Sequence, residues 1–235
     1  MGIAEKLTTI AENEQKVYEA GKQEEYDAIW DVLQKNGKRT DYTGFFANGL
    51  TNGGLLIGNI SPKYTIIAMN ADSMFYFYPE ELDLSQFLNE NKNISIDFSL
   101  VIAGTHMFAY SKIVRVPEIT KKGQFVAGFA EAKKLKTIDK LTVIEATSPF
   151  TNNTFQNCLE LENITIGGSI DGNGMNLQWS TKLTHDSLVS IINALADKSA
   201  DTSGTVWKVT VGSENLAKLT TEDLDNIQLK GWQFV

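Results

Sequence analysis

Three phenylalanines at similar intervals constrain the fold of this chain more than any other feature. Phe108, Phe129 and Phe155 are separated by 21 and 26 residues. The second and third are each followed by a leucine six positions later and an isoleucine nine positions later. An interval of about 20 to 29 residues is typical of proteins built from short repeated units. The spacing therefore predicts an array of stacked units rather than an ordinary single core.

The stretch "TFQNCLELENITIGGSI", residues 154–170, carries the strand signature L-x-x-L-x-L of leucine-rich repeats at Leu161, Ile164 and Ile166. The signature recurs in full in "VWKVTVGS", residues 206–213, and in part in "NISIDF", residues 93–98. So short a unit cannot bury its own apolar face, and its neighbours must cover it. We therefore predict an α/β repeat fold, with a short leucine-rich repeat solenoid over residues 41–235.

The first forty residues have a different, helical pattern. Apolar residues recur at spacings of three, four and seven, Gly21 interrupts them, and Gly37 is a natural helix stop. We predict an N-terminal helical hairpin over residues 1–40 and a domain boundary near residue 40, where the chain becomes rich in Gly and Asn. The hairpin either packs on the rest of the domain or serves attachment and homo-oligomer formation.

The C-terminal residues 180–235 are predicted to form a strand–helix cap over the open end of the solenoid. Thr184 is a candidate N-cap for one helix, and Thr220 with Asp223 forms an approximate capping box for another. Strands are expected at 206–211 and 232–235. Such a terminal unit covers an apolar surface that the last repeat would otherwise leave exposed.

The net charge, the single cysteine and the lack of long apolar segments limit which partners and compartments are expected for this chain. The net charge is −8, which disfavours nucleic acid and anionic membrane surfaces. A single cysteine, Cys158, rules out an intramolecular disulfide and any multi-cysteine metal site. The start of the chain lacks the pattern of a secretory signal, and no run approaches the length of a membrane span. We therefore expect synthesis in the cytosol and no membrane partner.

The stretch 154–170 resembles the BspA-like class of leucine-rich repeats, whose units carry a Phe, often an Asn-Cys pair, then "L..I.I" and a glycine. Residues 4–47 resemble the N-terminal region of leucine-rich repeat proteins encoded by bacteriophages and prophages of gut Firmicutes. "SENLAKLTTEDLDNIQLKGW", residues 213–232, resembles the ending of the same proteins. The resemblance implies a virion or tail-associated component, located in the virion or in the bacterial cytoplasm before assembly, with a surface used for recognition.

Residues that could carry chemistry are few. His106 and His185 lack any paired-ligand spacing and are interpreted as structural or exposed. Cys158 is expected to be buried by packing rather than reactive. The stretch "SIDGNGMN", residues 169–176, loosely resembles a calcium loop, but it lacks the later bidentate acid and is better explained as a tight turn. We predict no catalytic residue, no cofactor and no metal.

A locally basic edge is the candidate partner-binding site in an otherwise acidic chain. Its members are Lys121, Lys122, Lys133, Lys134 and Lys136. One interpretation is an ordinary solvated face, and the other is contact with an acidic partner surface or a glycan.

These observations predict a non-enzymatic, phage-derived structural or recognition protein. Its expected partner is a protein or carbohydrate surface, including other virion components, bound through the exposed strand face. One alternative is a bacterial surface adhesin of BspA-like type, which would place the protein on the cell surface. A less favoured alternative is a glycan-active enzyme, since two of the 29 acidic residues could converge.

Overall fold

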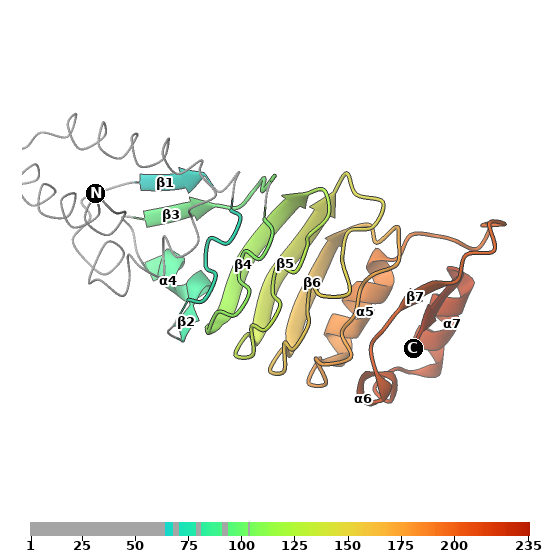
Figure 1. The fold of residues 1–235 in the computed structure, drawn as a ribbon. Helices are drawn as coiled ribbons and strands as arrows, with labels where there is room; N and C mark the ends of the chain where they lie inside the picture. The colour runs from blue at the N-terminus through green and yellow to red at the C-terminus, as the bar shows by residue number, and fades with distance from the viewer. Residues whose placement is uncertain (1–63, 68–70, 79–80, 91–93, 103) are drawn as a thin grey trace, which may run out of the picture.

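A mixed α/β fold with a central parallel sheet is seen in the computed structural model, which describes residues 64–67, 71–78, 81–90, 94–102 and 104–235. The central sheet has four strands in the order β2, β4, β5, β6, and all of its pairs are parallel. β4, β5 and β6 lie side by side in chain order (Figure 1). Their bounds are Leu82–Asp83 for β2, Ile113–Lys122 for β4, Thr137–Ile144 for β5 and Asn163–Gly168 for β6.

Two smaller parallel sheets and four helices complete the described part of the chain. One small sheet pairs β1 with β3, and the other pairs β7 with β8. The bounds are Tyr64–Ile67 for β1, Ile94–Asp97 for β3, Trp207–Val209 for β7 and Trp232–Phe234 for β8. The helices are α4, Leu84–Glu90; α5, His185–Ala194; α6, Ser213–Leu216; and α7, Thr221–Leu229.

The predicted fold class, a leucine-rich repeat solenoid, is wrong. A solenoid would carry one sheet through all of its units, whereas these strands divide among three separate sheets. The central sheet ends at β6 because the next element, α5, packs against that strand in place of a further one (Figure 1). Residues 180–235 alternate helices and strands, but their strands form a sheet of their own instead of a cap on a solenoid. The predicted hairpin over 1–40 and the boundary near residue 40 lie outside the described residues.

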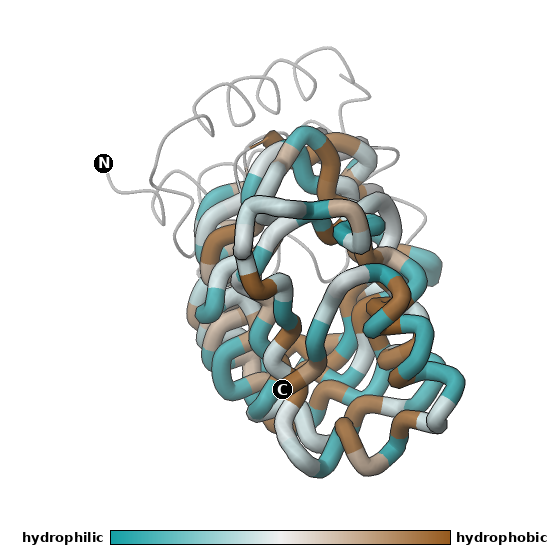
Figure 2. The backbone as a smooth tube through the Cα atoms, turned by 90° about the vertical axis from the view of Figure 1, so that its right-hand side faces the viewer, coloured by the Kyte–Doolittle hydropathy of each residue, from teal (hydrophilic) through white to brown (hydrophobic). Residues whose placement is uncertain are grey.

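The phenylalanine register in the sequence corresponds to a stack of buried rings. Phe75, Phe108, Phe129 and Phe155 follow one another with ring centroids 5.1, 5.3 and 5.7 Å apart and with nearly parallel planes. All four side chains are fully buried. Figure 2 shows hydrophobic and hydrophilic residues alternating along the successive turns of the backbone. The similar spacing of Phe108, Phe129 and Phe155 thus predicts contacts between neighbouring turns, although it does not predict how the strands divide into sheets.

The helices of the C-terminal part begin where the sequence predicted. Thr184 is the N-cap of α5 and accepts a hydrogen bond from the Ser187 amide at 3.3 Å. Thr220 and Asp223 form a complete capping box at the start of α7, so both capping predictions are confirmed. No helix in the described ranges is long and apolar enough to cross a membrane.

Candidate functional site

The predicted basic edge is divided between two ends of the central sheet. Lys121 and Lys122 close the C-terminal end of β4, whereas Lys133, Lys134 and Lys136 lie in the turn that leads into β5. The Lys136 amide donates to the Val114 carbonyl at 2.8 Å, which places this turn beside the beginning of β4. Eight residues of extended strand then separate the two groups by about 26 Å. The structure does not bring the five lysines together.

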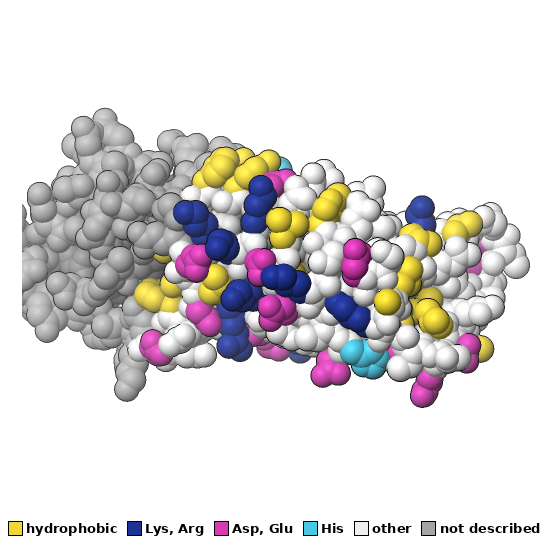
Figure 3. Space-filling view, turned by 90° about the horizontal axis from the view of Figure 1, so that it is seen from below, with side chains coloured by type: hydrophobic (Ala, Val, Ile, Leu, Met, Phe, Trp, Pro, Cys, Tyr) yellow, Lys and Arg dark blue, Asp and Glu magenta, His cyan; other side chains and the backbone are white. Residues whose placement is uncertain are grey.

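Several of these lysines are also neutralised by neighbouring acids. Nζ of Lys122 lies 2.8 Å from a Glu145 carboxylate oxygen, and Lys133 and Lys134 pair with Glu131 and Glu81 at 3.3 and 3.1 Å. Exposed pairs of this kind contribute about 0 to 1 kcal/mol each. In Figure 3, basic and acidic side chains are interspersed over the described surface. The lysines therefore do not form a positive patch.

Lys121 has a structural role that its sequence context concealed. The side chain is only 4% exposed, and its ammonium donates to the carbonyls of Ile102, at 2.8 Å, and of Lys122. Burial lowers the pKa of Lys121, and the nearby Asp72 carboxylate partly opposes that change. A buried ammonium that donates to backbone carbonyls holds the end of β4 against the preceding loop.

The outward face of the central sheet carries a network of compensated charges. Arg115 Nε lies 2.7 Å from Asp139 Oδ1, and Lys140 Nζ lies 3.3 Å from a Glu118 carboxylate oxygen. Ser85, on α4, donates its hydroxyl to the other oxygen of Asp139 at 2.7 Å. Positive and negative groups thus alternate across β4 and β5, and the face combines many hydrogen-bonding groups with little local net charge.

A bulge explains why Asp139 and Lys140 both reach this face although they are consecutive. Ile138 pairs with Ile164 and Leu141 with Ile166, so β5 uses three residues where β6 uses two. Ile138 and Leu141 are both buried, and the two residues between them are partly exposed. A bulge of this kind redirects side chains relative to strict alternation. The sequence analysis missed these residues, and the adjacent Asp and Lys inside a strand were the only signal.

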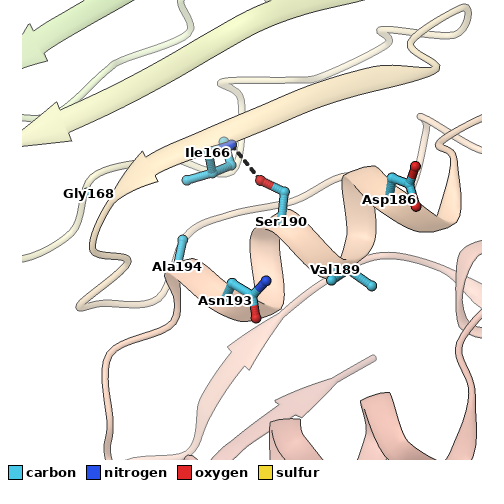
Figure 4. A pocket seen from close by; sticks show the side chains of 7 residues that line it. All are labelled: Ile166, Gly168, Asp186, Val189, Ser190, Asn193 and Ala194. Atoms are coloured by element: carbon cyan, nitrogen blue, oxygen red, sulfur yellow. Dashed lines mark hydrogen bonds between the residues drawn. The ribbon is translucent and has the colours of Figure 1, made fainter.

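A hollow of about 520 Å³ opens where the sheet meets α5. Five of its lining residues lie on α5 at spacings of three and four residues, so they share one helix face. Figure 4 shows these side chains along the helix, with the serine directed toward β6. The lining residues are Ile166, Gly168, Asp186, Val189, Ser190, Asn193 and Ala194.

Two serines of α5 complete the hydrogen bonding of the neighbouring strand. Ser187 Oγ accepts from the Ile164 amide at 3.0 Å, and Ser190 Oγ accepts from the Ile166 amide at 2.9 Å (Figure 4). These hydroxyls replace the carbonyls that a fifth strand would offer. An uncovered strand edge is a template for unwanted pairing, and α5 removes it here. The sheet therefore ends in a helix, and residues of that helix and of β6 line the hollow together.

Glycines at the end of β6 leave the other wall of the hollow without side chains. Gly168 has φ of 77°, and a Cβ there would lie 2.8 Å from the Val143 carbonyl oxygen. The hollow offers one carboxylate from Asp186, one amide from Asn193 and the hydroxyl of Ser190, beside apolar Ile166 and Val189. General acid–base chemistry usually needs two titratable groups with different roles, and the lining residues include only Asp186. The arrangement offers hydrogen-bonding groups and one carboxylate beside an apolar surface.

The two histidines lie where their contacts are structural. His185 Nε2 lies 2.8 Å from Asp223 Oδ2 and joins the first turn of α5 to that of α7. Hydrogen bonds from Thr220 and from His185 hold the pKa of Asp223 down at about 2. His106 packs edge-on against the ring of Tyr76, with 6.0 Å between centroids. The expectation that both histidines are structural or exposed agrees with these positions.

Cys158 and the loop 169–176 also have clear structural explanations. Cys158 is fully buried, its Sγ donates to the Phe129 carbonyl at 3.1 Å, and burial raises the pKa of its thiol. In the loop, Asp171 pairs with Lys198 at 2.5 Å, and Asn173 accepts from the Lys208 amide at 2.7 Å. Across the described ranges, no group of three or more His, Cys, Asp or Glu side chains is placed to hold a metal ion.

Comparison with known proteins adds no relative. No protein-family model, no curated protein and no solved structure matches the chain.

Proposed function

We propose that this chain is a non-enzymatic, phage-derived recognition protein that binds a protein or glycan surface through the outward face of β4, β5 and β6. The observation that carries the proposal is the charge-compensated face itself. Arg115 with Asp139 and Lys140 with Glu118 place paired charges on neighbouring strands at 2.7 and 3.3 Å. A face of this kind offers many donors and acceptors, and little long-range attraction to nucleic acid.

The sheet face is also a rigid surface on which ligand groups can be positioned. β4 and β5 are in continuous register from Arg115 opposite Thr137 to Lys122 opposite Ile144. Thr120, Thr142 and Gly167 lie opposite one another across the three strands, and the side chain of Lys140 lies beside Gly167. Charged groups on one side of these residues and the α5 hollow on the other give an extended partner several points of contact.

The phage setting rests on the sequence resemblance of residues 4–47 and 213–232 to phage and prophage proteins. It predicts that the protein accompanies assembled particles. The test is mass spectrometry of density-gradient-purified particles released from the source bacterium after induction with mitomycin C. Peptides of this chain should copurify with particle proteins across the gradient, and their absence from the particle fractions would reject the virion assignment.

The binding surface is tested with Thr142→Arg. Thr142 lies at the centre of the face and is partly exposed, so a long charged side chain there would cover the face and leave the core unchanged. The matched control is Thr202→Arg, in the exposed loop before β7. With the full chain added to particles that lack it, Thr142→Arg should reduce association at least tenfold, and Thr202→Arg should not. Equal association of both variants would contradict the assignment of this face.

A further inference from the structure

A second surface, on the turns rather than on the strands, has a regular composition that the proposed function does not use. Successive turns end at Phe77, Tyr110, Glu131 and Asn157. All four have a positive φ, between 56° and 61°. The Phe77 amide donates to the Ala109 carbonyl, the Tyr110 amide to the Ala130 carbonyl and the Glu131 amide to the Gln156 carbonyl, at 3.1, 2.8 and 2.7 Å. These four residues, here called the turn row, therefore occupy equivalent positions in adjacent layers.

The first two members of the turn row are unusual residues for this backbone position. A positive φ is uncommon outside glycine and asparagine, and it is a genuine outlier for a bulky side chain. Asparagine tolerates a positive φ, so Asn157 suits this backbone position, whereas the bulky side chains of Phe77 and Tyr110 make the same conformation less favourable. Both aromatic side chains are nevertheless exposed, by 56% and 45%. The positive φ belongs to the turn geometry, since it recurs at the other turns, but neighbouring exposed aromatic rings are more typical of a binding surface than of a packing requirement.

The two rings pack against each other as a fixed pair. Their centroids are 4.9 Å apart and their planes differ by 31°. Tyr76 supports the pair edge-on, with its centroid 4.4 Å from that of Phe77 and 5.6 Å from that of Tyr110. Tyr76 in turn packs on a small buried cluster of alanines, Ala109, Ala127 and Ala130. Neighbouring contacts therefore restrict the rings, and little freedom would be lost when a ligand stacks on them.

The other two members of the turn row supply hydrogen bonds with little net charge. Asn157 Nδ2 donates to Glu131 Oε1 at 2.6 Å, and Lys133 Nζ lies 3.3 Å from Glu131 Oε2. The carboxylate is thus offset by an ammonium and oriented by an amide. The Glu131 carboxylate beside the rings can accept hydrogen bonds from hydroxyl groups, and it would repel a phosphate or another anionic ligand.

We propose that the turn row is a binding site for a neutral oligosaccharide. Pyranose rings have an apolar face of C–H groups and a rim of hydroxyls. The apolar face of one sugar unit would pack on the exposed side of the Phe77–Tyr110 pair, and hydroxyls of the following unit would donate to Glu131 and accept from Asn157. This site is separate from the sheet face and does not depend on its assignment.

The test is affinity electrophoresis of the full chain in native gels that contain laminarin, galactomannan, starch or hydroxyethylcellulose. We expect at least one of these neutral polysaccharides to retard the protein. Phe77→Ala and Tyr110→Ala should each weaken that retardation at least tenfold, and Glu131→Gln should weaken it several-fold. Matched controls are Val206→Ala and Leu224→Ala, because these apolar side chains are exposed by the same 56% and 45%. Circular dichroism verifies that each variant is folded.

Four results would overturn the proposal. The first three are no retardation in any of the four gels, retardation of the Phe77→Ala and Tyr110→Ala variants as strong as that of the wild type, and an equal loss of retardation in the Val206→Ala or Leu224→Ala control. The fourth result combines two observations: the wild type binds no polysaccharide, and Phe77→Ala changes the molar mass that light scattering measures. The turn row would then be a self-association surface. Thr142→Arg should leave the retardation unchanged, which separates this site from the sheet face.

Discussion

Replacing Phe129 by alanine should destabilise the protein more than almost any other single change. Phe129 is fully buried and its ring lies between those of Phe108 and Phe155, at 5.3 and 5.7 Å. A third ring, Phe125, meets it edge-on at 5.2 Å. The substitution therefore removes an inner ring of the stack and three aromatic contacts at once.

The magnitude follows from how little the surroundings can collapse. The Phe108 amide donates to the Gly128 carbonyl at 2.7 Å, and the Phe129 amide donates to the Thr154 carbonyl at 3.0 Å. These backbone bonds fix the spacing of the layers, so the space left by the ring stays open. Phe→Ala changes in cores cost about 3 to 5 kcal/mol, and a cavity that cannot close falls in the upper part of that range. We expect a loss of about 4 kcal/mol.

The assay is equilibrium urea unfolding followed by circular dichroism. With an m value of about 3 kcal/mol/M, a loss of about 4 kcal/mol lowers the midpoint by about 1.3 M. The control is Phe77→Ala, because Phe77 has the same side chain, is 56% exposed and lies outside the stack. That variant should lose less than about 1 kcal/mol. A Phe129→Ala midpoint within about 0.3 M of the wild type, or an equal loss in Phe77→Ala, would refute the role given to the stack.

Three further predictions concern the C-terminal part and the buried thiol. Lys230 donates through Nζ to three carbonyls at the end of α5, so Lys230→Met should cost about 1 to 3 kcal/mol in thermal unfolding, and Lys208→Met, at an exposed position, should cost less than about 0.5. The pKa of Asp223 is lowered from 3.8 to about 2, so its stabilising effect is present above pH 4 and is lost as the pH falls through about 2. Asp223→Asn should therefore lower the melting temperature at pH 6 and approach the wild type near pH 2; a constant difference would contradict this. Because burial raises the pKa of the Cys158 thiol, iodoacetamide at pH 8 should modify the cysteine only in denaturant, and rapid labelling of the native protein would disprove its burial.

Local signals in the sequence predicted local structure well. Thr184 and the Thr220–Asp223 box mark helix starts because a cap depends only on residues three positions apart. The burial of Cys158 and the contacts among the phenylalanine rings were also predictable, since residues at similar spacing meet their equivalents in the next turn.

The division into sheets and the composition of the site were not predictable from the sequence. The central sheet ends because the hydroxyls of Ser187 and Ser190 accept hydrogen bonds from amides of β6, more than twenty residues earlier in the chain. No sequence pattern around these serines predicts such a contact. The sequence suggests that Lys121, beside Lys122, is a solvated charge. In the structure its buried ammonium donates hydrogen bonds to the backbone carbonyls of Ile102 and Lys122. Adjacent Asp139 and Lys140 share a face only because of a bulge, which depends on the pairing of β5 with β6.

The role of the sheet face as the binding surface is tested most directly by site-specific crosslinking. p-Benzoylphenylalanine would be placed at position 142 on the face, and in a separate variant at position 202 in the loop before β7. After irradiation of purified particles, mass spectrometry identifies the residues that are joined. We predict that position 142 crosslinks to one defined particle protein and that position 202 does not. Crosslinks from position 202 alone, or none from position 142 in particles that contain the protein, would contradict recognition through this face.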